Sequence, residues 1–81
     1  MPQQNSTKIV RQEKISSQVY EQLLAQIKSN KWKEGEKLPS ENEMRQEFGV
    51  SRISIREAMQ KLKALGIVET RHGEGDRKSV V

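Results

Sequence analysis

The sequence predicts a small, mainly α-helical domain in which three helices are followed by one β-hairpin. An apolar residue recurs every four positions from Ile15 to Ile27, two helical segments follow a serine and end at a glycine, and a β-branched run leads into a glycine-rich turn. The first pattern is typical of an amphipathic helix and the last of a hairpin. With 81 residues and no cysteine, such a domain depends on one apolar core for its stability.

The first helix is predicted over residues 14–30, behind a polar segment. Residues 1–12 show no apolar periodicity, so we expect them to form a flexible or disordered arm, with the folded domain over residues 13–81. Asn30 is expected to end the helix, and Ser16 is expected on its solvent side. The predicted buried face consists of Ile15, Val19, Leu23, Leu24 and Ile27.

The segment KWKEGEKLPS, residues 31–40, is expected to be irregular, because Gly35 and Pro39 both interrupt helices. Trp32 is predicted to cover the end of the first helix. Leu38 precedes a proline, a position that disfavours helix, so a short extended segment is predicted there.

Two further helices are predicted, each begun by a serine cap. Ser40 and Glu43 have the spacing of a capping box, in which each side chain accepts a hydrogen bond from the backbone N–H of the other. Gly49 is expected to end that helix. The third helix is predicted from Ser51 to about Leu65, with a stop at Gly66. The predicted buried residues are Met44 and Phe48 in the second helix, Val50 in the turn, and Ile55, Ala58, Met59, Leu62 and Leu65 in the third helix.

The C-terminal part is predicted to form the hairpin. Residues 67–71 are rich in β-branched side chains and are expected to form its first strand. The HGEGD sequence, residues 72–76, provides a turn. The returning strand is predicted over RKSVV, residues 77–81, with Val80 and Val81 as its apolar residues.

A short helix, a brief turn and a longer helix together form a helix-turn-helix. In DNA-binding examples the second helix of the pair enters the major groove, with its N-terminal residues toward the base edges. Arg52 and Arg56 lie four residues apart and share a face that is not the core face. Arginine contacts guanine or phosphate in such a groove, and Ser51 and Ser54 are candidates for the same partners. The alternatives are a solvated arginine face, an ion pair between Arg56 and a carboxylate of the second helix, and a serine that acts only as a cap. Two roles stay open for Ile53. It either contacts a thymine methyl group or packs on the second helix.

A hairpin beside a helix-turn-helix is the layout of a winged helix, so the predicted fold is a winged helix-turn-helix of three helices plus a wing. The wing tip contains Arg71, His72 and Gly73, which we expect to approach the DNA backbone or enter the minor groove. The alternative is an ordinary β-turn that requires glycine. Glu74 and Asp76 argue against a wing that binds by charge alone.

Composition restricts the other functions. Lys and Arg number 15 against 11 Asp and Glu, and the net charge of +4 is compatible with a polyanionic partner. One histidine, no cysteine and no nucleotide-binding glycine loop disfavour an enzyme, a metal site and a cofactor, while first-turn capping explains Glu41 and Glu43.

No apolar run approaches the ~20 residues of a membrane span, so we expect a soluble intracellular protein. The remaining alternatives are a protein-interaction module without operator specificity and, since aromatic residues are few, a less favoured RNA-binding domain.

The run LPSENEMRQEFGVSRISIREAMQKLKALGIVETRHGEG, residues 38–75, resembles the N-terminal DNA-binding domain of GntR-type bacterial regulators. The LPSE start, the FGVSR turn, the IREAM segment and the RHGEG start of the wing carry the resemblance. Arg56-Glu57-Ala58 is more similar to the FadR-type branch than to the HutC-type branch, which tends to have Gln there. The resemblance implies a cytoplasmic bacterial regulator whose dimer binds double-stranded DNA at a short palindromic operator.

The resemblance also implies DNA contacts at matching positions of this sequence. These positions are Ser51, Arg52, Ser54 and Arg56 in the third helix, and His72 and Gly73 in the wing. Asn42 stands where the family often has a DNA-contacting arginine, and Arg45 on the neighbouring turn is expected to compensate.

Two departures from the family pattern concern the C-terminal end. The family usually has Thr and Phe after the last wing glycine, whereas Gly75 is followed here by Asp76, so the second wing strand lacks its usual aromatic anchor. The family also carries a C-terminal effector-binding and dimerising domain. We expect that domain to be absent from this chain, which would then be a homodimer on DNA and a monomer or weak dimer off DNA.

Overall fold

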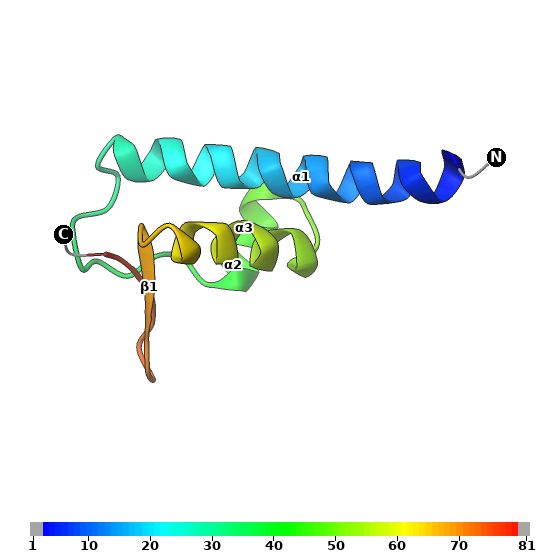
Figure 1. Cartoon of the computed structure of the whole chain (residues 1–81). Helices are drawn as coiled ribbons and strands as arrows, with labels where there is room; N and C mark the ends of the chain where they lie inside the picture. The colour runs from blue at the N-terminus through cyan, green and yellow to red at the C-terminus, as the bar shows by residue number, and fades with distance from the viewer. Residues whose placement is uncertain (1–2, 80–81) are drawn as a thin grey trace.

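The computed structural model describes the backbone of residues 3–79 and the side chains of residues 12–79. Its elements in order are α1 (Gln3–Lys28), α2 (Glu41–Phe48), α3 (Arg52–Ala64), β1 (Val68–Arg71) and β2 (Gly75–Lys78). The long helix α1 lies across α3, and the β1–β2 hairpin projects from the opposite side of the helices (Figure 1). The arrangement is the predicted winged helix-turn-helix.

Helix α1 begins at Gln3, so the start predicted at Lys14 is wrong. The apolar repeat marks only the part of the helix that packs on the core, whereas the backbone helix continues through a polar segment rich in good helix formers. Asn30 ends the helix as predicted, with a left-handed φ of 63°. Flexibility of residues 1–12 stays a prediction, and Met1 and Pro2 lie outside the described residues.

The core forms where α1 crosses α3. Ile55, Ala58 and Leu62 have no exposed surface, and Val19, Leu23 and Ile27 of α1 face the same cluster. Most of the predicted buried residues are confirmed. The cluster is completed by Trp32, Leu38, Met44, Met59 and Val68.

Two burial predictions are wrong, those for Leu65 and Ser16, and four residues predicted to be buried are only half-buried. Leu65 is 61% exposed, because it caps the end of α3 and already belongs to the turn. The half-buried residues are Ile15, Leu24, Phe48 and Val50. Ser16 is buried between α1 and α3, where its hydroxyl donates to the Gln12 carbonyl at 3.0 Å and contacts the Glu57 carboxylate. A small hydroxyl with partners on both helices is compatible with a closely packed interface.

The predicted helix caps are confirmed. The Ser40 hydroxyl accepts a hydrogen bond from the backbone N–H of Glu43 at 3.2 Å, and the Glu43 carboxylate accepts one from the backbone N–H of Ser40 at 2.8 Å. Gly49 has the left-handed φ of 66°, and its N–H donates to the Arg45 carbonyl. Ser51 caps α3 by accepting from the backbone N–H of Ser54 at 3.3 Å.

The hairpin has an antiparallel register that pairs Val68 with Lys78 and Arg71 with Gly75. Strand β2 therefore starts two residues before the predicted 77–81 segment, since the turn is tighter than HGEGD suggests, and Val80 and Val81 lie outside the described residues. The predicted extended segment is confirmed, because Lys37 forms a bridge with Arg77. The segment around Lys37 thus lies beside β2 as a third, very short strand-like segment of the wing.

Lys78 anchors β2 to the rest of the domain. Its ammonium group donates to the carbonyls of Ile27 at 3.2 Å and Trp32 at 3.0 Å, and to the Asn30 side-chain oxygen at 3.3 Å. A cation at the C-terminal end of α1 is favoured by the free carbonyls and the helix dipole there. A charged group therefore fixes a strand that contains no aromatic side chain.

The capping box predicts a pH-dependent contribution to stability. Hydrogen bonds from Ser40, first from its backbone N–H and then from its side chain, lower the pKa of Glu43 below 4.5. A lowered folded-state pKa contributes stability above the unfolded-state pKa, and this contribution is lost as the pH falls through the folded-state value. Wild type is therefore expected to have a higher thermal midpoint than Glu43→Gln at pH 7, and the difference should shrink as the pH falls below 4.5 and vanish only below the lowered folded-state pKa. Circular dichroism melts of both proteins from pH 7 to pH 3 measure the two thermal midpoints. A difference between the midpoints that does not change with pH would contradict a stabilising role of the ionised Glu43 carboxylate.

Candidate nucleic-acid interface

The candidate interface is formed by the start of α2, the N-terminal half of α3 and the wing. Helices α2 and α3 pack against each other, and the Ser40 and Ser51 caps fix where each helix begins. Since the face of α3 that carries Ile55 and Leu62 is buried, its opposite face is exposed.

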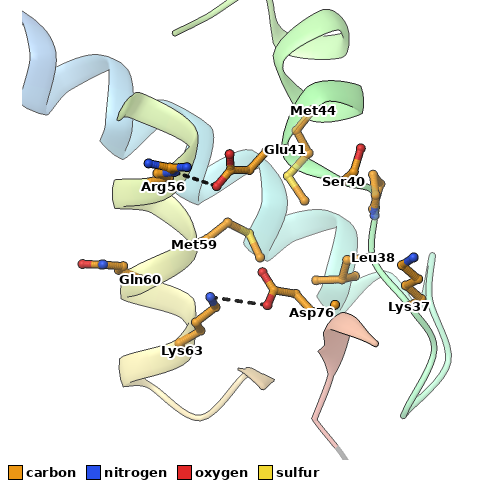
Figure 2. Close-up of a pocket in the computed structure, with 12 residues that line it drawn as sticks. Lys37, Leu38, Ser40, Glu41, Met44, Arg56, Met59, Gln60, Lys63 and Asp76 are labelled. Atoms are coloured by element: carbon orange, nitrogen blue, oxygen red, sulfur yellow. Dashed lines mark hydrogen bonds and ion pairs between the residues drawn. The ribbon is translucent and has the colours of Figure 1, made fainter. Parts of the chain in front are cut away.

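Arg52 and Arg56 occupy this exposed face, with side chains 52% and 60% exposed. Both arginines lie close to the same carboxylate, that of Glu41 on α2. Arg56 Nε donates to Glu41 Oε2 at 2.8 Å, and Arg52 Nε lies 3.7 Å from Glu41 Oε1 (Figure 2 shows the Arg56 pair). The hydrogen bond to Glu41 raises the pKa of Arg56, and an arginine is charged at neutral pH in any environment. Sequence reasoning allowed a pair between Arg56 and a carboxylate of the second helix, but it did not identify Glu41 as that carboxylate or expect Arg52 to share it.

The two predicted serines differ in accessibility. Ser51 is exposed at the start of α3, whereas Ser54 is only 3% exposed. Their hydroxyl oxygens lie 3.3 Å apart, so Ser54 lies beneath the cap rather than at the surface. In this conformation Ser51 is available to a ligand, and Ser54 supports it.

Asn42 and Arg45 lie one turn apart on α2 and contact each other. Arg45 donates from one terminal nitrogen to the Asn42 side-chain oxygen at 3.3 Å. Its Nε is buried and has no hydrogen-bond partner among the described residues. The pair extends the polar surface from α3 to α2.

The wing tip is exposed and tightly turned. Gly73 has a φ of 75°, and the Glu74 N–H donates to the Arg71 carbonyl at 2.9 Å. His72 and Gly73 are exposed at the tip. Arg71 is half-buried and pairs with Glu69 of its own strand at 3.1 Å. The wing therefore presents a small, locally neutralised tip.

A hollow of about 430 Å³ lies between the start of α2, α3 and β2 (Figure 2). Glu41 and Arg56 are on one side of it, and on the other Lys63 Nζ lies 3.4 Å from Asp76 Oδ1. The Lys63–Asp76 pair joins the last turn of α3 to the wing. The surface is thus continuous from the third helix to the hairpin.

The described residues give no sign of two other kinds of site. Within residues 3–79, no helix combines the length and the apolarity that a membrane span requires. The same residues contain no group of three or more acidic, histidine or cysteine side chains placed to hold a metal ion.

The sequence matches the family described as "Bacterial regulatory proteins, gntR family" over residues 15–77. The HTH-type transcriptional repressor NanR of Enterobacter sp. (strain 638) is 42% identical over 67 residues, which cover 83% of this chain and 26% of that repressor. NanR of Salmonella newport (strain SL254) is 44% identical over 66 residues, which cover 82% of this chain and 25% of the relative. This chain therefore spans about a quarter of the length of these curated relatives.

Solved structures with the same fold include AraR(DBD) in complex with operator ORR3, with a TM-score of 0.76 and 35% identity. The alignment covers 80% of this chain and 78% of that one. Streptococcus agalactiae GntR has a TM-score of 0.71 and 36% identity, and the alignment covers 79% of this chain and 31% of that one. These matches confirm the predicted winged helix and favour a regulatory role over an enzymatic one. Because the family pattern covers most of the chain, this protein belongs to the gntR family of bacterial regulatory proteins.

Proposed function

We propose that this chain binds double-stranded DNA in a sequence-specific manner, with the N-terminal half of α3 in the major groove and the wing tip at the minor groove. The observation that carries the proposal is the exposed arginine pair, Arg52 and Arg56, on the face of α3 opposite the core. The major groove is about 12 Å wide and admits a helix in this orientation. An exposed Ser51 at the N-terminus of α3 adds a hydroxyl and free backbone N–H groups, which favour phosphate.

The other predicted contacts are assigned by their accessibility. Asn42 on α2 and His72 and Gly73 on the wing are exposed and suited to direct contact with DNA. Arg45, which is half-buried, is assigned to the same contact surface through its pair with Asn42. Arg71 would bind phosphate only after leaving Glu69, and Ser54 is assigned a supporting role beneath Ser51.

Several finer features belong to the same proposal. The operators named in the AraR structures support an operator as the DNA target, and we extend to this chain a short palindromic operator bound by a homodimer in the bacterial cytoplasm. The NanR relatives are named repressors, so repression is the proposed effect. Arg56-Glu57-Ala58 favours the FadR-type branch of the family.

The competing function is a protein-interaction module that uses the same surface without operator specificity. A selection experiment separates the two functions. The chain is incubated with a labelled random duplex pool at low and moderate salt, binding is followed by fluorescence anisotropy, and the retained DNA is sequenced. We expect a steep salt dependence and an enriched short inverted repeat. Retention without enrichment would leave only phosphate binding, and no retention at low salt would support the protein-interaction module.

Arg52→Ala is expected to weaken binding to the selected duplex by about 1–3 kcal/mol and to relax one base preference, as for an arginine that contacts guanine. Lys14→Ala is the control, because an exposed lysine on α1 is suited to phosphate alone and should weaken all sequences alike. Anisotropy titrations against the selected duplex and its single-base variants measure both effects. An equal loss on every duplex for Arg52→Ala would contradict base recognition by this side chain.

Glu41→Gln is expected to raise non-specific affinity and lower specificity. The substitution removes one negative charge from the interface and releases Arg52 and Arg56 from their shared carboxylate. Binding to a scrambled duplex should tighten several-fold, since phosphate contacts dominate non-specific binding, while the preference for the selected duplex falls. Glu34→Gln is the matched control, because Glu34 lies on the loop after α1 and forms no ion pair among the described residues. Identical titrations for the two variants would exclude a special role for Glu41.

A further inference from the structure

One apolar side chain lies fully outside the core on the face that the proposed function places against DNA. Ile53, the second residue of α3, is 56% exposed, whereas Ile55 two positions later is completely buried. Ile53 is absent from the partly buried residues that pack against the core. The structure therefore disfavours packing on α2, one of the two roles that its sequence left open.

Folding gains little from an isoleucine at this position. A β-branched residue is a weaker helix former than alanine or glutamine, and a side chain that is more than half exposed recovers little of that cost through burial. The only other exposed large apolar side chain among residues 12–79 is Leu65, at the far end of α3. Leu65 lies twelve positions after Ile53, which corresponds to about 18 Å of helix, so the two side chains do not form one apolar patch.

The neighbours of Ile53 indicate the chemistry of its partner. Arg52 precedes it, and Arg56 follows three positions later on the same side of the helix. Both arginines are held by Glu41, which leaves the apolar side chain exposed beside two cations at the helix N-terminus. Within a major groove the apolar group on the base edges is the methyl group at C5 of a pyrimidine.

We propose that Ile53 is a specificity-determining residue that contacts the C5 methyl group of a thymine in the operator. The inference rests on the proposed function, since it requires the N-terminal half of α3 to lie in the major groove. The contact buries one methyl group against the exposed isoleucine side chain. Its expected contribution is about fourfold in affinity for that base, the effect of removing one methyl-sized apolar group from water.

The test removes the methyl group and nothing else. Each thymine of the selected duplex is replaced in turn by deoxyuridine, and the duplexes are titrated with wild type and Ile53→Ala by fluorescence anisotropy. We expect wild type to bind one substituted duplex about fourfold more weakly than the parent, and Ile53→Ala to bind both equally. Leu65→Ala, the matched exposed apolar control, should keep the wild-type difference.

A second arm separates the methyl group from the thymine base. At the sensitive position the T·A pair is replaced by C·G or by 5-methylcytosine·G. If the methyl group itself is recognised, wild type should bind the 5-methylcytosine duplex about fourfold more tightly than the cytosine duplex, and Ile53→Ala should not distinguish them. Ile53→Gln, which favours helix and replaces the apolar end by an amide, is the second variant in case Ile53→Ala unfolds.

The outcomes separate this inference from the proposed function. Specific binding with no deoxyuridine effect, or with the same effect in wild type and both Ile53 variants, overturns the role of Ile53 and leaves DNA recognition standing. The absence of an enriched duplex overturns both.

Discussion

The packing of α3 against α1 is the constraint on which the rest of the molecule depends. Ile55, Ala58 and Leu62 are buried against an α1 face that includes Leu23. Full burial of a side chain such as Ile55 or Leu62 contributes about 1.5–3 kcal/mol relative to exposure, so rotating α3 about its axis would lose several such terms at once. A helix whose inner face is fixed has a fixed outer face, because the two are set by one periodicity. The core thus determines which side chains of α3 meet a ligand.

The wing is held by charge and backbone pairing rather than by an aromatic side chain. The Lys37–Arg77 bridge attaches β2 to the segment before α2. Lys78 attaches the end of β2 to the Ile27 carbonyl in the last turn of α1 and to the Trp32 carbonyl in the loop that follows. Both attachments connect the hairpin to parts of the chain that also position α2 and α3. The wing and the third helix are therefore oriented by one framework, and a ligand that spans them meets a preformed surface.

Local features were predictable from the sequence, and features that depend on two elements were not. The Ser40–Glu43 cap was predicted correctly because its residues are neighbours in the chain, and the buried stripe of α3 followed from its periodicity. Periodicity extended that stripe one residue too far, to Leu65, since it carries no signal for where the tertiary contact ends. The arginines of the candidate site were found as an exposed pair. A carboxylate of the second helix was a possible partner of Arg56 from the sequence. Glu41 could not be singled out, because it lies fifteen positions from Arg56 and meets it only after α2 packs on α3.

The charge arrangement of the interface favours selectivity over affinity. Arg52 and Arg56 each have a carboxylate partner in the free protein, and Arg71 has Glu69. A phosphate that binds one of these arginines replaces an existing carboxylate partner. The net gain in binding free energy is therefore smaller than for binding to an unpaired cation, although exposed pairs of this kind are individually weak. A base edge that offers guanine acceptors in the geometry of the arginine fork gains directed hydrogen bonds in addition to charge. An interface whose cations are already paired therefore gives up part of its sequence-independent attraction to DNA, and the contacts that remain decisive are those that depend on the base.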